Sequence, residues 1–176
     1  MGTRPTADRA IQLTEINAAS SPDTLSSARE LLLEYGRFVV AHPQSAGFCY
    51  GTLEQEVAAL PSSYLDKQGG CLMAQVDHEP AGFVGWRAVP AVVAEDAWEL
   101  KRLWVRPNMR GLNLGQTLTQ AVIDRAKAAR RKAIYLDTAP AVMAAAHRLY
   151  LSMGFESCPP YNDNPVNELV WMIKRI

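Results

Sequence analysis

The sequence has little cysteine and no excess of charge. Its three cysteines, Cys49, Cys71 and Cys158, lie far apart and form no Cys-x-x-Cys pair. An odd number of widely spaced cysteines argues against a disulfide framework and against a thiolate zinc site. Basic and acidic residues number 18 each, so the formal net charge is zero. This balance gives no general attraction to nucleic acid or to an anionic membrane, and any recognition by charge must be local.

The sequence also lacks a long apolar run. No stretch approaches the roughly 20 apolar residues that span a membrane, and the start of the chain has no apolar core of signal-peptide length. We therefore expect a soluble, cytoplasmic protein that binds neither membrane nor nucleic acid. At 176 residues with 48% apolar content, one domain with a substantial core is expected. That domain would cover residues 11–176, after a flexible tail over residues 1–10.

The spacing of apolar residues predicts the order of helices and strands. It gives strands over about 11–16, 71–76, 81–89, 98–105, 134–137, 155–158 and 168–173, and helices over about 21–42, 53–60, 114–131 and 141–152. A turn at Asp77–Pro80 makes the second and third strands an antiparallel hairpin. Strand, helix and strand over 98–137 form a parallel crossover. The predicted fold class is α/β, with a mixed, mostly antiparallel sheet flanked by helices.

The turn that contains Arg110-Gly111-Leu112-Asn113-Leu114-Gly115 joins the strand at 98–105 to the following helix. A helix that begins just after a strand offers unpaired N–H groups and the positive end of its dipole, which suit an anion such as pyrophosphate. The glycines let a ligand approach the main chain, and Arg110 can pair with phosphate. The turn lacks the features of a P-loop or a dinucleotide fingerprint. By itself it is equally compatible with a simple helix start and a solvated arginine.

Two motifs together resemble a known family. Leu103–Pro107 followed by Arg110–Gly115 is similar to the acetyl-CoA signature of the GNAT superfamily of N-acetyltransferases, whose core is Gln/Arg-x-x-Gly-x-Gly/Ala. Further on, Leu149–Phe155 resembles the LYxxxGF segment of the same family. The predicted element order also resembles the family's fold over nearly the whole chain. The resemblance implies an enzyme that moves an acetyl group from acetyl-CoA, its co-substrate, to a primary amine by direct transfer in a ternary complex, without a metal.

The resemblance also implies which residues contact acetyl-CoA. Backbone N–H groups in the region of Leu103, Trp104 and Val105 would hold the thioester carbonyl, and the pyrophosphate would lie on Arg110, Gly111, Leu112, Asn113, Leu114, Gly115 and Gln116. Asn113 departs from the pattern, because the family usually has glycine there. Asparagine tolerates a left-handed backbone best among the other residues, and its amide can also cap the helix or bind a phosphate oxygen. Asn113 motivates an alternative function, an acyl-CoA sensor or partner module with little turnover.

Two residues are candidates for the chemistry. Tyr150 occupies the family's position for the general acid that protonates the departing thiolate. Glu99, on the strand before the signature, is the candidate base; the alternative is a solvated or salt-bridged carboxylate. His147, one turn before Tyr150, is either a surface residue or a second member of the site. Cys158 has no basic cluster near it in sequence and is interpreted as a packing residue.

The acceptor entrance is expected between residues 44–52 and 159–167. These segments contribute Phe48, Tyr50, Tyr161, Asn162, Asp163 and Asn164. Such a mixed polar and aromatic lining suits a small amine such as an amino acid or a polyamine, and equally a peptide N-terminus or a lysine. The sequence leaves the acceptor, the acyl-chain preference and the presence of a homodimer open.

Overall fold

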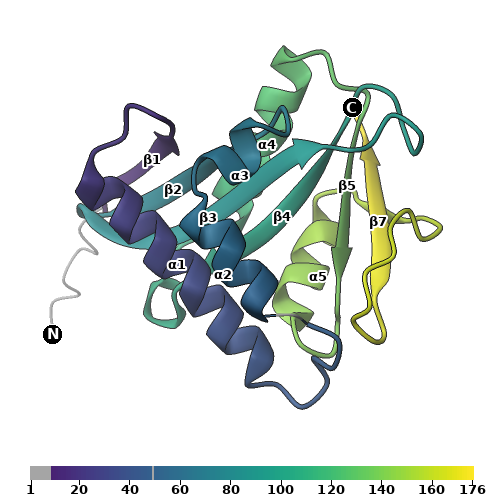
Figure 1. Cartoon of the computed structure of the whole chain (residues 1–176), viewed down its shortest axis with the longest axis horizontal. Helices are drawn as coiled ribbons and strands as arrows, with labels where there is room; N and C mark the ends of the chain where they lie inside the picture. The colour runs from purple at the N-terminus through teal and green to yellow at the C-terminus, as the bar shows by residue number, and fades with distance from the viewer. Residues whose placement is uncertain (1–8, 49) are drawn as a thin grey trace, which may run out of the picture.

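The computed structural model describes residues 9–48 and 50–176, so most of the expected tail over residues 1–10 lies outside the described residues. The strands are β1 (Ile11–Ile16), β2 (Gly70–Val76), β3 (Glu79–Ala88), β4 (Ala97–Val105), β5 (Ala133–Thr138), β6 (Glu156–Ser157) and β7 (Val170–Arg175). The helices are α1 (Pro22–Val40), α2 (Tyr50–Ala58), α3 (Ser62–Leu65), α4 (Leu114–Ala128) and α5 (Ala144–Ser152), with a 3₁₀ turn η1 (Pro107–Met109) (Figure 1).

The predicted mixed α/β fold is confirmed, with small differences at element ends. The short helix α3 was not predicted. Helix α5 begins at Ala144 instead of 141, because the N–H groups of Val142 and Met143 donate to the carbonyl of Ala139 and close a turn there. Helix α1 begins as predicted: the hydroxyl of Ser21 accepts from the N–H of Thr24, and Pro22 occupies the first turn.

The seven strands form one sheet in the order β1-β2-β3-β4-β5-β7-β6. All neighbours are antiparallel except β4 and β5, whose parallel pairing joins only Ala97–Glu99 to Ala133–Tyr135. Beyond Glu99, β4 carries a bulge: Arg102 has a φ of 58°, and the pairing with β3 shifts register there. The bulge bends β4, and the sheet opens between β4 and β5.

Helices cover both faces of the sheet (Figure 1). Helices α1, α2 and α3 lie on one face, where Leu31, Leu53 and Tyr64 pack with Phe83 and Trp104 of the sheet. On the opposite face, residues of α4 and α5 join a second cluster that includes sheet residues Leu100 and Leu136. Among the described residues, no helix has the length and the apolar content that crossing a bilayer requires. Because helices pack on both faces of the sheet, the opening between β4 and β5 is the place where the two faces meet.

Candidate active site

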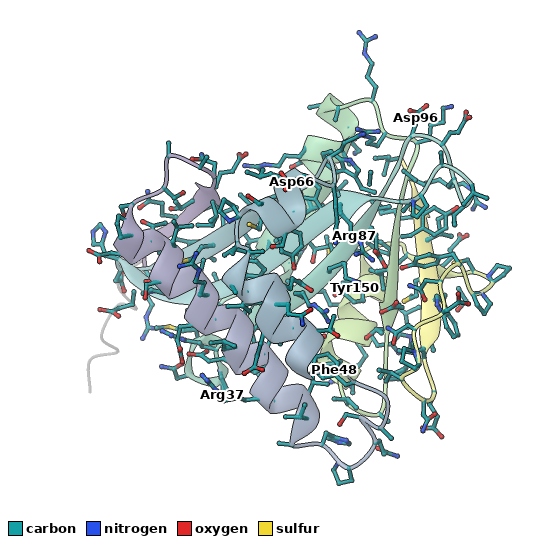
Figure 2. The ribbon with its side chains drawn as sticks, viewed as in Figure 1. Arg37, Phe48, Asp66, Arg87, Asp96 and Tyr150 are labelled. Atoms are coloured by element: carbon teal, nitrogen blue, oxygen red, sulfur yellow. The ribbon has the colours of Figure 1, made fainter. Side chains whose placement is uncertain are left out.

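A cleft of about 780 Å³ lies where β4 and β5 diverge. Its walls come from α1, α2, β3, β4, β5, α5 and the loop between β6 and β7. The side chains that carry charge into it are Glu56, Lys67, Arg87, Lys101, Arg102, Asp137 and Asp163. Arg87, Phe48 and Tyr150, all labelled in Figure 2, belong to the same lining. A cleft of this volume suits a small molecule.

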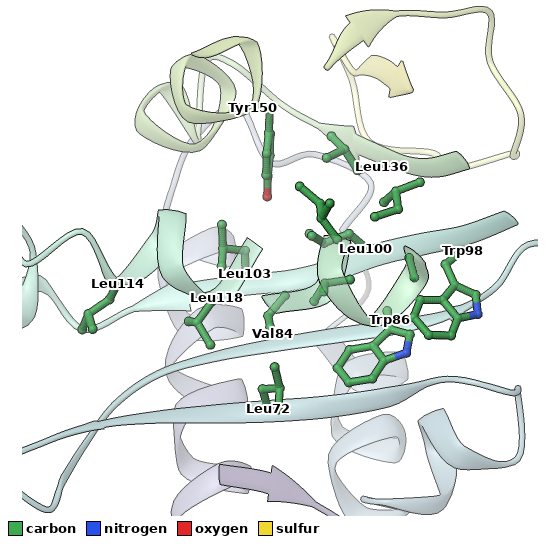
Figure 3. Packing of buried hydrophobic residues seen from close by; sticks show 14 of the residues in the cluster. Leu72, Val84, Trp86, Trp98, Leu100, Leu103, Leu114, Leu118, Leu136 and Tyr150 are labelled. Carbon is green, nitrogen blue, oxygen red and sulfur yellow. The ribbon is translucent and has the colours of Figure 1, made fainter. Parts of the chain in front are cut away.

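Tyr150 approaches the opening from the α4 and α5 side. Only 4% of the residue is exposed, and its ring packs on Phe155 at 5.6 Å between centroids. Its hydroxyl points toward β4, near Leu100 and Leu103 (Figure 3). Burial, followed by the charges of Tyr35 and Asp137, raises the pKa of this phenol well above its ordinary value. The raised pKa keeps the phenol neutral and protonated.

The signature turn keeps the backbone that glycine would give. Gly111 has a φ of 83°, and Asn113 has φ 57° and ψ 19°, which is the left-handed conformation. The side chain of Asn113 makes no capping hydrogen bond, so the turn survives the substitution and the amide stays available. A Cβ built on Gly111 would meet nothing within 4 Å, which leaves open space beside the turn.

Two residues of the turn serve the protein's own packing. A Cβ on Gly115 would lie 3.2 Å from Leu149 Cδ2, so this glycine lets α5 approach α4. The guanidinium of Arg110 lies over the rings of Trp104 and Phe38, at 5.6 and 5.9 Å. The expected contact between Arg110 and phosphate stays a prediction, as do those of the main chain at Leu112, Leu114 and Gln116. Leu114 is buried, so only its backbone can reach a ligand.

Glu99 lies behind the cleft wall. Its carboxylate is 2.7 Å from Arg87 Nε and 3.6 Å from Lys101 Nζ, and it accepts hydrogen bonds from Tyr161 (3.0 Å) and Asn162 (3.4 Å). Burial alone would raise its pKa, but Lys101 and Arg87 outweigh it and hold the pKa below its ordinary value. These contacts fit the salt-bridged alternative, and the base role of Glu99 stays a prediction.

The other expected residues take varied places. Phe48, Asn162, Asp163 and Asn164 line the cleft as expected. The hydroxyl of Tyr161 instead donates a hydrogen bond to Glu99, and its ring packs edge-on against Tyr135. The side chain of Tyr50, like Cys49, lies outside what the structure describes. His147 is half-buried on α5, outside the cleft lining, and Cys158 packs against a small apolar cluster as expected.

Sequence reasoning missed the charged residues of the cleft floor. Lys101 follows Glu99 by two positions on β4, Arg87 pairs with Glu99 across β3, and Asp137 lies near the end of β5. Asp137 accepts hydrogen bonds from the side chains of Asn162 (2.7 Å) and Asn164 (3.2 Å). The available signal was an acidic residue at the carboxyl end of a parallel strand, where open α/β sheets bind ligands. Within the described chain, no group of acidic, histidine or cysteine residues is arranged to hold a metal ion.

A family model and a curated relative identify the same family of proteins. The model of the Acetyltransferase (GNAT) family matches residues 29–155. An uncharacterised N-acetyltransferase of Schizosaccharomyces pombe is 31% identical over 157 residues, which cover 89% of this chain and 91% of that protein.

Solved structures share the fold. A GNAT-family acetyltransferase from Staphylococcus aureus Mu50 aligns with a TM-score of 0.74 at 20% identity, covering 94% of this chain and 99% of the other. The PaiA N-acetyltransferase of Thermoplasma acidophilum, solved in complex with coenzyme A, aligns with a TM-score of 0.66 at 16% identity over 95% and 99% of the two chains.

Proposed function

The chain belongs to the GNAT family of acetyltransferases, and we propose that it transfers the acetyl group of acetyl-CoA directly to a primary amine bound in the cleft. The observation that carries this proposal is the gap between β4 and β5. Tyr150 faces the gap from the α5 side, and the polar cleft floor borders it from the α1 side. An acyl donor on one side and an amine on the other would meet there without a covalent enzyme intermediate.

The divergence of the strands supports the role proposed for the backbone around Leu103–Val105. In the part of the chain that the structure describes, β4 has no β5 partner beyond Glu99. N–H groups on that edge are free to donate to the thioester carbonyl as it gains negative charge. Bound acetyl-CoA would supply the acetyl group and the thiolate leaving group. The turn from Arg110 to Gln116 would hold its pyrophosphate at the start of α4.

The transfer requires two proton movements. The amine nitrogen attacks the carbonyl carbon, the carbon–sulfur bond breaks, and Tyr150 gives its proton to the departing thiolate. The acceptor must also lose a proton, because an ammonium group has no lone pair. Glu99 is the candidate from sequence, but it lies behind the cleft wall. Of the carboxylates that line the cleft, Glu56 pairs with Arg102 and Asp163 is exposed, whereas Asp137 accepts from two amides and has no lysine or arginine within ion-pair distance in the described chain. We therefore assign the proton acceptor to Asp137.

A thiol-release assay tests the proposed function. Acetyl-CoA would be offered with a panel of amino acids, polyamines and short peptides, and release of CoA thiol should require an acceptor. The acetylated product would be identified by mass spectrometry. Thermal stabilisation by acetyl-CoA without thiol release from any acceptor would contradict catalysis and favour the sensor alternative.

A further inference from the structure

We propose that the acceptor is a small amine that also carries a carboxylate, such as a free amino acid. Lys101 and Arg87 bind the carboxylate, and Asp137 receives the amine. This inference rests on the proposed acetyl transfer and names the acceptor class for the same cleft.

The sheet register brings the two binding groups face to face. Glu99 of β4 pairs with Tyr135 of the parallel strand β5, and this is the last pair before the strands diverge. Two residues further on, Lys101 and Asp137 point to the same face of the sheet as that pair. Both line the cleft, on opposite sides of the gap. A molecule in the gap therefore meets a cation on one side and an anion on the other.

Two cations beside β4 share a single carboxylate as their ion-pair partner. Glu99 is the single carboxylate in contact with both Arg87 and Lys101. Arg102, the next cation, is already satisfied: it pairs with Glu56 at 3.0 Å and stacks on the rings of Tyr35 and Phe48. Lys67 and Asp163, which also line the cleft, are both exposed to solvent. A bound carboxylate would give Lys101 and Arg87 a second anionic partner at close range.

Lys101 is the cation best placed to bind a carboxylate. Only 16% of its side chain is exposed, and Glu99 at 3.6 Å is its one ion-pair partner in the described chain. Within those residues, its ammonium donates no hydrogen bond shorter than 3.5 Å. A largely buried ammonium with free donors gains from an added anion. Arg87, with 33% of its side chain exposed, lines the same cleft and pairs with the same carboxylate.

Asp137 has the opposite character. Its carboxylate accepts from two asparagine amides and has no lysine or arginine within ion-pair distance in the described chain. The ammonium group of an acceptor would give this carboxylate a cationic partner at ion-pair distance. A polyamine would instead bring a second cation toward Lys101 and Arg87, which like-charge repulsion opposes.

Matched acceptors give a test that needs no variant. The natural amino acids and their C-terminal amides would be compared as acetyl acceptors under the same conditions. We expect kcat/KM for the best amino acid to exceed that of its amide by about tenfold or more, because one charge-assisted contact changes affinity by about that factor. The amide has the more easily deprotonated amine, so amine reactivity cannot produce this preference. Equal rates for acid and amide, or a preference for polyamines, would overturn the inference.

One substitution tests the assigned cation. Lys101→Met keeps the length and apolar stem of the side chain, and Glu99 retains Arg87 and Tyr161. It should raise KM for the amino acid about tenfold or more and leave KM for the amide within about twofold. The control is Lys132→Met, which removes an exposed lysine paired with Asp96 at the far end of β5. This variant should change neither the KM for the amino acid nor the KM for the amide. Equal losses for acid and amide in Lys101→Met would assign Lys101 a structural role only.

A binding measurement separates this inference from the proposed chemistry. Calorimetry with CoA in place would measure the affinity of the same amino acids and amides. Preferential binding of amino acids without thiol release would contradict the proposed transfer and support the carboxylate site. Thiol release from amines that lack a carboxylate, as fast as from amino acids, would support the transfer and contradict the carboxylate site.

Discussion

Tyr150 is the residue whose surroundings fit its expected role most directly. Its phenol is buried, neutral and directed at the gap in the sheet. Such a group contributes only when the thiolate forms, so it should affect the chemical step and not the binding of the donor.

Tyr150→Phe should therefore lower kcat by about 10²-fold or more while the affinity for acetyl-CoA changes little. Steady-state kinetics and calorimetry measure the two quantities separately. Retention of the phenylalanine ring preserves the packing on Phe155. A variant as active as the parent would mean that water or another group, with His147 the next to test, protonates the thiolate.

Glu99 and Asp137 offer a comparison between two carboxylates. Asp137→Asn should lower kcat/KM at neutral pH, and the deficit should shrink as the pH rises, because more of the acceptor is then already deprotonated. Glu99→Gln should leave Arg87 and Lys101 without their shared counter-charge and give a deficit that does not vary with pH. A pH profile of kcat/KM for both variants, measured with one good acceptor, shows which carboxylate accepts the proton. A deficit that shrinks only in Glu99→Gln would restore the role predicted for Glu99.

At the scale of the elements, β3 depends on a glycine for its contact with α3. A Cβ added to Gly85 would lie 2.3 Å from a ring carbon of Tyr64, whose side chain is fully buried. The ring cannot give way easily, because Phe83 packs against it and Glu56 accepts its hydrogen bond.

Gly85→Ala should therefore destabilise the fold, by about 1 to 3 kcal/mol in the free energy of unfolding. Urea denaturation measures the change. Gly51→Ala is the matched control: no atom lies within 4 Å of its added Cβ, and alanine favours the helix α2, so stability should be equal or higher. Similar stabilities for both variants would show that α3 is free to shift away from the sheet.

For the whole molecule, buried acidic residues link stability to pH. Glu56 and Glu99 are both largely buried and paired with cations, which outweigh the effect of burial and lower each pKa below the ordinary 4.5. The unfolded chain therefore takes up protons at these sites before the folded protein does, so the ion pairs contribute stability above about pH 4.5.

The free energy of unfolding should fall as the pH drops below about 4.5 and through the lower pKa values of the folded protein. Thermal denaturation between pH 3 and 7 checks this. Glu56→Gln should flatten the dependence, because the neutral amide does not titrate. An equally steep loss of stability in that variant would assign the acid sensitivity to other carboxylates.

The sequence by itself determined the order of the elements, the start of α1, the signature turn and the family. These features depend on local patterns: apolar periodicity, a Ser-Pro cap, and short motifs read along the chain. Asn113 could be assigned a left-handed backbone in advance for the same reason, because that preference belongs to the residue.

The tertiary structure alone decided which charges meet in the cleft. Lys101 and Asp137 face each other because a parallel pairing ends after Glu99, and Arg87 joins them because β3 pairs in one register with β4. Glu99 became a buried ion-pair partner through contacts with residues 12 and 62 positions away. Local sequence carries no record of such pairings. A side chain's charge partners depend on strand register and loop closure, and these are fixed only when the whole sheet packs.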